Sequence, residues 1–374
     1  MTDLLRRHIT KIILLAVLFL TACSGSSWNN PYPASENGQN ILYSSFSERP
    51  KHLDPIRSYS SNEYAFIGQI YEPPLQYHFL KRPYVLTPLT ATEVPKPKLL
   101  DKDGNELSKN ALVEQIAYSV YRIKIKPGIN YQPHPAFTPD GKEGYLYHNL
   151  SDTQLEKIHT LDDFEKVSFR EVTVADYVYQ MKRMAQPSLH SPILGIMTDY
   201  IVGLRELAKE LKQVEDKSRK EGKGDATEGF VDLNKFELSG VKIIDRYTYE
   251  IKVKGLYPQL VYWLAMPFFA PMPEEAIRFY AQPGLKDKNI SLDWYPVGTG
   301  AYMLTTNNPN REMVMEKNPN YRDVFYPRVG ATGDTEAGLL RDAGSKLPFV
   351  DKVVYKLEKE TIPYWNKFLQ GYYD

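Results

Sequence analysis

A single cysteine, Cys23, stands among 374 residues, and it directly follows a segment that is typical of an export signal. Basic residues come first, and nine uninterrupted apolar residues then occupy positions 12–20. Nine residues is the length of a signal-peptide core and is too short to span a bilayer. We therefore predict that residues 1–22 are a signal peptide. The mature chain then folds outside the cytoplasm with one thiol and no disulfide, so its stability has to come from packing.

The residues just before the cysteine predict a lipid anchor. Leu20-Thr21-Ala22-Cys23 resembles the bacterial lipobox, in which a signal peptidase cuts before a cysteine whose thiol carries diacylglycerol. Several acyl chains, at about 0.8 kcal/mol per buried methylene, hold a protein firmly on a membrane. Residues 23–38 are rich in Ser, Asn, Pro and Gly and predict a lipidated flexible tether. We expect a lipid-anchored protein of the cell envelope, on the periplasmic or extracytoplasmic face, with the inner or the outer membrane left open.

Composition narrows the class of protein. The chain is 42% hydrophobic and 25% charged, which is typical of a globular core, and its 46 basic side chains equal its 46 acidic ones. Without a basic surplus we expect no nucleic-acid partner, and we expect a monomer. The seven histidines are scattered, and neither HExxH nor GxSxG occurs. We therefore expect no enzyme, no cofactor and no metal site.

Several residues that might suggest chemistry have simpler interpretations. Asp162-Asp163 and Glu274-Glu275 are adjacent in sequence, and we interpret them as a loop and a helix start, not as acid/base pairs. His52 and His134 fall on separate loops and are expected to face solvent, because two such histidines make a poor ligand set.

Periodicity predicts a mixed α/β fold. Apolar residues alternate with basic residues over 121–126 and with polar residues over 247–254, which indicates two strands. A short apolar strand near residue 40 precedes a helix-compatible segment at 61–71. Thr173 opens a capping-box pattern whose helix should pack on a sheet.

Two segments look like insertions. Residues 204–230 are highly charged and predict a helix with i,i+4 pairs such as Glu215 with Arg219, which we interpret as a solvated surface insertion. Residues 132–163 are loop-rich and carry several prolines and glycines. Neither segment predicts chemistry.

Several motifs, in order, are similar to those of the family 5 extracellular solute-binding proteins, the substrate-binding components of oligopeptide, dipeptide and nickel ABC importers. The motifs are LDP at Leu53, IYEPPLQY from Ile70, YRIKIKPGINY from Tyr121, VTVADYVYQMKRM from Val172, and VGTGAYML from Val297 followed by NPNYR from Asn318. The last pair is the most specific of them. The resemblance covers roughly residues 40 to 374, apart from the two insertions.

The resemblance implies a periplasmic-binding-protein-like type II lobe over residues 39–374, with a smaller inserted subdomain at about 71–165. Residues 350–374 resemble the start of the crossing to a second lobe, which is largely missing from this sequence. We expect either a fragment or a naturally shortened protein.

The resemblance also implies a function, namely a substrate-binding lipoprotein that captures (oligo)peptides and delivers them to the membrane subunits of an ABC permease. One alternative is a non-transport envelope lipoprotein of the same fold, acting as a peptide sensor or interaction partner. Another is a binder of a different solute such as nickel, haem or an oligosaccharide.

In the peptide-binding relatives, the backbone after the first strand pairs with the peptide as an added strand. The ligand-binding residues implied here are Ser45, Phe46, Ser47 and Glu48, with Tyr131 and Tyr302 as candidate wall residues. The chain has 28 tyrosines, so packing competes with ligand contact for any one of them. We expect Gly298 and Gly300 to form turns that need positive φ.

Overall fold

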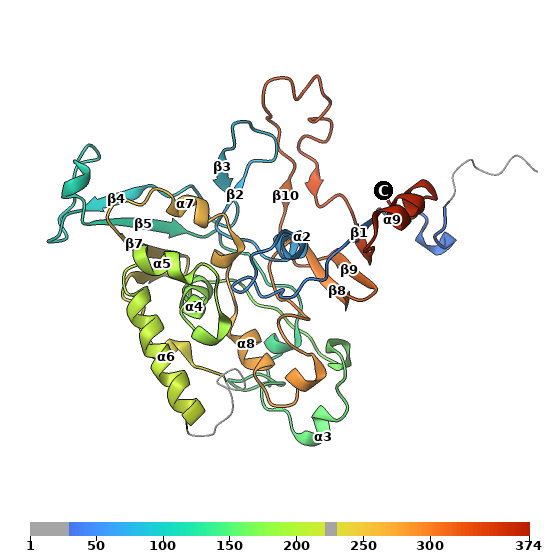
Figure 1. Cartoon of the computed structure of the whole chain (residues 1–374), viewed down its shortest axis with the longest axis horizontal. Helices are drawn as coiled ribbons and strands as arrows, with labels where there is room; N and C mark the ends of the chain where they lie inside the picture. The colour runs from blue at the N-terminus through green and yellow to red at the C-terminus, as the bar shows by residue number, and fades with distance from the viewer. Residues whose placement is uncertain (1–29, 221–229) are drawn as a thin grey trace, which may run out of the picture.

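The computed structural model describes residues 30–220 and 230–374 (Figure 1). The predicted signal peptide and Cys23 lie outside the described residues. The strands are β1 (Ile41–Phe46), β2 (Leu75–Tyr77), β3 (Leu86–Pro88), β4 (Pro97–Leu100), β5 (Tyr118–Lys124), β6 (Val241–Asp245), β7 (Thr248–Lys254), β8 (Tyr302–Asn308), β9 (Glu312–Lys317), β10 (Val324–Phe325), β11 (Lys346–Leu347) and β12 (Lys352–Leu357). The α-helices are α2 (Ser61–Ile70), α3 (Asp152–Leu155), α4 (Val174–Met184), α5 (Leu194–Tyr200), α6 (Leu204–Lys220), α7 (Leu260–Trp263), α8 (Glu274–Tyr280) and α9 (Thr361–Leu369). The mixed α/β class predicted from the sequence is confirmed.

One four-stranded sheet joins the two ends of the described chain. Its order is β1-β12-β9-β8, with β1 parallel to β12 and the other neighbours antiparallel. Ile41 pairs with Lys352 and Phe46 pairs with Leu357, so β1 and β12 lie side by side (Figure 1). Because β1 is the outermost strand, one of its edges is not paired in this sheet.

A second four-stranded sheet is fully antiparallel, with the order β4-β5-β7-β6. The alternation predicted for β5 is confirmed, since Tyr121 and Ile123 are buried while Arg122 is exposed. Every residue of β5 pairs with a residue of β7. Of the strands in segment 71–165, which is expected to form a subdomain, β2 and β3 pair with each other, whereas β4 and β5 share the second sheet with β6 and β7.

Helices α4 and α5 contact the second sheet, and α6 packs on α5 (Figure 1). Helix α4 begins directly after Thr173 as predicted, and the Thr173 amide donates to the Asp176 carboxylate over 2.9 Å. Helix α6 is not simply a solvated insertion, because Leu204, Leu207 and Leu211 are buried in the core. Helix α6 is amphipathic: its leucines form an apolar stripe that packs inward, and most of its charged residues lie on the other faces.

Helix α2 packs into the core that the two large sheets share. Phe66, Ile67 and Ile70 on its inner face are buried in the same hydrophobic cluster that contains residues from both large sheets. Its opposite face, which includes Tyr64 and Ala65, is exposed. Within residues 30–220 and 230–374, no helix has the length and apolar character needed to cross a bilayer.

Candidate ligand-binding site

Strand β1 presents backbone groups to solvent at its outer edge. In a parallel pair, alternate residues direct both backbone groups to the same neighbour. Phe46 faces β12, because its carbonyl accepts from the amide of Glu358 over 2.9 Å. Residues 43 and 45 therefore face the other edge. At Tyr43 that edge is occupied by Asp374, whose amide donates to the Tyr43 carbonyl over 3.0 Å and whose carboxylate accepts from the Tyr43 amide over 2.8 Å.

Ser45 is the next residue in this phase. Within the described part of the chain, its amide and carbonyl have no backbone partner on the outer edge. An extended ligand can therefore add here as a further strand, with main-chain hydrogen bonds supplying affinity. The free edge at Ser45 is the central feature of the candidate site.

A cavity of about 380 Å³ opens beside the end of β1. Three of the four residues implied by the family resemblance, Ser45, Phe46 and Ser47, line it, and Glu48 is exposed just beyond it. The Phe46 side chain is buried, with its ring edge-on to Phe66 at 6.0 Å between centroids. Phe46 therefore contributes backbone and core packing, and its ring is not free to grip a ligand.

The two tyrosines expected on the wall are core residues, which corrects the expectation. Tyr131 is fully buried and stacks on Phe137 at 5.5 Å between centroids. Tyr302 is also buried, and its hydroxyl donates to the carbonyl of Val350 over 2.8 Å. Neither ring lines the cavity at β1. In a chain with this many tyrosines, residue type alone does not distinguish packing from ligand contact.

The loop between β1 and α2 is held by a buried carboxylate in the first turn of α2. Glu63 accepts from the amides of Lys51 and His52, each over 2.8 Å, and from the Ser58 hydroxyl over 2.5 Å. Burial raises the pKa of Glu63, but hydrogen bonds from Ser58, Ser60 and the two amides outweigh burial and leave the pKa below its ordinary value. The loop is thus fixed to the helix before any ligand arrives.

The LDP motif has a structural role in the same loop. Asp54 forms an ion pair with Arg183 of α4 at 2.6 Å, and both side chains are at most 5% exposed. Asp293 accepts from the amides of Leu53 and Asp54 over 3.0 and 3.1 Å, and its carboxylate lies 2.8 Å from the Arg57 guanidinium. Two distant parts of the chain, around Arg183 and Asp293, therefore converge on this loop.

The other motifs of the resemblance also contact one another. Glu72 accepts from the Thr299 hydroxyl over 3.0 Å and pairs with Arg322 at 2.5 Å. Asn318 donates to the carbonyl of Gly300 over 3.0 Å. The motifs YEPP, VGTG and NPNYR thus form one polar junction at the end of α2.

Gly298 and Gly300 are needed for close approach and not for positive φ, which corrects our expectation. Neither has a left-handed backbone conformation. A Cβ atom on Gly298 would lie 1.9 Å from the carbonyl oxygen of Ile70, and one on Gly300 would lie 2.2 Å from that of Gln69. The Gly300 amide donates to the Ile70 carbonyl over 2.8 Å. Only glycine allows the two backbones to meet.

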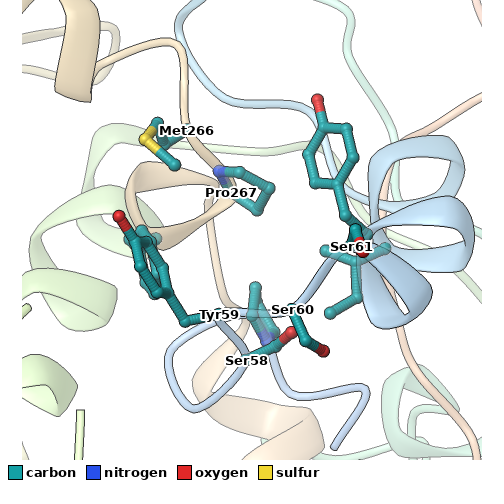
Figure 2. A pocket seen from close by; sticks show the side chains of 10 residues that line it. Ser58, Tyr59, Ser60, Ser61, Met266 and Pro267 are labelled. Carbon is teal, nitrogen blue, oxygen red and sulfur yellow. The ribbon is translucent and has the colours of Figure 1, made fainter. Parts of the chain in front are cut away.

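A second cavity, of about 250 Å³, lies between the loop before α2 and the segment Met266–Phe268 (Figure 2). Its aromatic and sulfur-containing lining residues are Tyr59, Tyr64, Met266 and Phe268. Ser61, the first residue of α2, lines both this cavity and the cavity at β1. Sequence reasoning missed these residues. The only signal was the pair of tyrosines in SYSSNEY, directly after the LDP motif.

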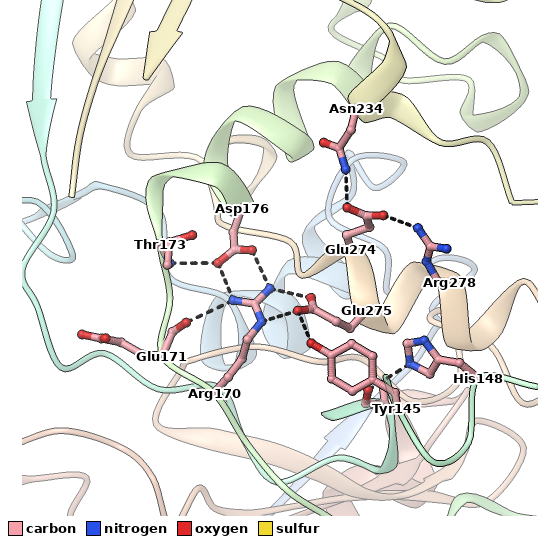
Figure 3. A network of polar contacts seen from close by, with 11 residues as sticks. Tyr145, His148, Arg170, Glu171, Thr173, Asp176, Asn234, Glu274, Glu275 and Arg278 are labelled. Carbon is pink, nitrogen blue, oxygen red and sulfur yellow. Dashed lines mark hydrogen bonds and ion pairs between the residues drawn. The ribbon is translucent and has the colours of Figure 1, made fainter. Parts of the chain in front are cut away.

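The adjacent carboxylates of α8 are each engaged by a different arginine (Figure 3). Glu275 pairs with Arg170 at 2.6 Å, and Glu274 pairs with Arg278 at 2.7 Å. Arg170 also pairs with Asp176 at 2.7 Å. Burial raises the pKa of both Glu275 and Asp176, whereas Arg170 lowers the pKa of both. For Glu275 the arginine outweighs burial and the pKa lies below its ordinary value; for Asp176 burial outweighs the arginine and the pKa lies above it. Glu274 begins α8, as expected.

His134 is fully buried, which contradicts the expected solvent-facing position. Its Nε2 atom lies 2.7 Å from the hydroxyl of Tyr280. Burial lowers the pKa of His134 to about 3, so its ring is neutral at physiological pH. His52 is partly exposed, and its Nδ1 atom lies 3.5 Å from Asp293.

Comparison with known families identifies the group to which this chain belongs. The model described as "Bacterial extracellular solute-binding proteins, family 5 Middle" matches residues 168–374, which is more than half of the chain. The chain belongs to family 5 of the bacterial extracellular solute-binding proteins. The resemblance recognised in the sequence is therefore confirmed at the level of the family.

Among curated family 5 relatives, the periplasmic oligopeptide-binding protein OppA of Salmonella typhimurium is 28% identical over 153 residues. That match covers 41% of this chain and 23% of OppA.

Solved structures of family 5 proteins show the same fold. The murein tripeptide-binding protein MppA of Escherichia coli aligns with a TM-score of 0.53 at 15% identity, over 90% of this chain and 45% of MppA. OppA of Listeria monocytogenes, bound to peptide, aligns with a TM-score of 0.53 at 14% identity, over 90% of this chain and 46% of that protein. The chain thus spans less than half the length of these structures. This agrees with the single-lobe architecture expected from the sequence.

Proposed function

We propose that this chain is the substrate-binding lipoprotein of an ABC importer, and that it captures (oligo)peptides outside the cytoplasmic membrane and delivers them to the permease. The observation that carries the proposal is the free edge of β1 at Ser45, which opens on a cavity in a member of this family. An unpaired edge recognises what every peptide has, namely alternating amide and carbonyl groups. Relatives named for oligopeptide and murein tripeptide binding support the same ligand class.

Lipid attachment at Cys23 completes the proposal, because a tethered receptor stays close to its permease. The part of the predicted tether that precedes Tyr32 would let the lobe reach the membrane subunits without being embedded, whereas the Tyr32 ring stacks on Tyr43 of β1. A peptide sensor of the same fold, without a transport partner, remains the second candidate. Peptide uptake by cells lacking this chain separates the two, since only the importer role predicts lost uptake that plasmid-borne protein restores.

Peptide binding itself is tested by thermal unfolding of the chain from Ser24 onward. A pool of short peptides at 100 times the dissociation constant should add about 2.7 kcal/mol to the free energy of unfolding. Nickel, haem and an oligosaccharide pool serve as parallel additions. A rise in midpoint with peptides alone is expected. If the midpoint rises only with one of the other solutes, that solute and not peptide is the ligand. If the midpoint rises with none of them, solute capture by this lobe on its own is contradicted.

A further inference from the structure

The second cavity carries no charged side chain. The residues around it include three serines and two prolines besides the aromatic residues, Met266 and Ile67, and none is acidic or basic (Figure 2). Burying an unpaired charge in such surroundings is unfavourable, whereas burying apolar surface is favourable. A cavity of about 150 Å³ is already sufficient to bind benzene. At about 250 Å³, this one has room for an aromatic or large aliphatic side chain.

The walls of this cavity are held in place without a ligand. The Tyr59 ring lies 5.9 Å from the ring of Phe268, between centroids. The Tyr64 ring lies along α2 above Gly68, where a Cβ atom would come within 3.2 Å of it. Ser58 is tied to Glu63, as described above. Tyr59 and Tyr64 nevertheless remain 67% and 55% exposed, so two positioned aromatic rings still have faces that a ligand can cover.

The cavity adjoins the edge where the proposed peptide would bind. Ser61 lines both cavities, and the exposed face of α2, which includes Ala65, lies between them. Resting on the proposed peptide-binding function, we propose that the cavity between Tyr59, Tyr64 and Met266 is a specificity pocket for one uncharged, apolar side chain of the bound peptide. The pocket selects aromatic and large aliphatic side chains over charged ones.

A peptide series tests this proposal by isothermal titration calorimetry on the chain from Ser24 onward. The series starts from tetra-alanine. Four further peptides each replace one alanine with phenylalanine, at positions one to four, and two matching sets of four carry lysine or glutamate instead of phenylalanine. We expect phenylalanine at one position to bind about 10- to 100-fold more tightly than alanine there. Lysine and glutamate at that position should bind more weakly than alanine.

The pocket residues are tested through the ratio of the phenylalanine to the alanine affinity. In the double variant Tyr59→Ala/Tyr64→Ala, the ratio should fall to about one, and Gly68→Ala, which presses on the Tyr64 ring, should lower it as well. Tyr84→Ala, which removes a 69% exposed tyrosine elsewhere, is the matched control and should leave the ratio unchanged.

The outcomes separate this proposal from the function on which it rests. If tetra-alanine binds and phenylalanine gives no advantage at any position, the specificity pocket is wrong while peptide binding stands. An advantage that survives the double variant also overturns the pocket. If no peptide of the series binds, the proposed function fails and the pocket fails with it.

Discussion

Asp54 and Arg183, which are 129 residues apart in the sequence, form an almost completely buried ion pair at 2.6 Å. Asp54 belongs to the loop that precedes α2, and Arg183 belongs to α4. Arg183 also donates to Gln180 over 2.8 Å, and Asp54 accepts from the amide of Ile56 over 3.1 Å. The pair therefore fixes the loop before α2 to a helix of the core.

Removing the arginine from this pair should destabilise the protein strongly. Arg183→Met leaves the Asp54 carboxylate buried without its cation, and a loss of about 3–5 kcal/mol in the free energy of unfolding is expected. The control is Arg122→Met, which breaks a surface pair whose arginine is 67% exposed and should change stability by less than about 1 kcal/mol. Denaturant unfolding measures both. Equal effects of the two changes would contradict the role assigned to the buried pair.

Replacing glycine by alanine should lower the stability of the protein in the VGTG motif and raise it in helix α5. Gly300→Ala forces a Cβ atom to within 2.2 Å of the Gln69 carbonyl oxygen, and overpacking of this kind is expected to destabilise by about 1–3 kcal/mol. Gly195→Ala, in helix α5 with nothing within 4 Å, should stabilise by about 0.5–1 kcal/mol. Thermal unfolding measures the stability of the two variants. A Gly300→Ala protein that is more stable than the unmodified one would refute the close-contact explanation.

The Glu63 carboxylate should make the stability of the folded protein decrease at acidic pH. Its pKa in the folded protein is below the ordinary value of 4.5, so the stability that it contributes is present above that pH and is lost as the pH falls through the folded pKa. We expect Glu63→Gln to be less stable than the unmodified protein at pH 7, with the difference narrowing below about pH 4.5. Midpoints measured from pH 7 to pH 3 test this. Glu106→Gln, at a side chain that is 62% exposed, should show no such trend.

Two neighbouring serines of β1 should respond differently to proline. Ser45→Pro removes an amide on the free edge and is expected to abolish the peptide-induced rise in midpoint with a modest loss of stability. Ser44→Pro removes an amide that faces β12 and should destabilise the protein by about 3 kcal/mol or more. A full peptide response from Ser45→Pro would show that the ligand does not add to β1.

The predicted lipid anchor is tested separately from the fold. Cys23→Ser removes the thiol that would carry diacylglycerol and should release the protein from membranes without changing its thermal unfolding. Membrane fractionation followed by a salt wash measures the release. Protein that still sediments with washed membranes would rule out anchoring through Cys23.

The local pattern of the sequence was sufficient for several elements of the fold and for the family. The alternation at β5 and the capping pattern at Thr173 predicted structure correctly, because side-chain period and helix capping depend on neighbours along the chain. Ser45 and Ser47, implied as ligand-binding residues by the family resemblance, line a cavity at the end of β1, and their contact with a ligand stays a prediction.

Only the tertiary structure decided which groups are accessible and which approach closely. Pairing of β1 with β12 joins residues about 311 apart, and no local pattern encodes which edge remains free. Tyr131 and His134 are buried by packing, although their sequence neighbourhood is loop-like. Gly300 is required because another backbone passes within contact distance, and Tyr59 and Tyr64 line a cavity because Met266 lies across from them. These are relations between distant segments, which form only when the core buries its apolar surface.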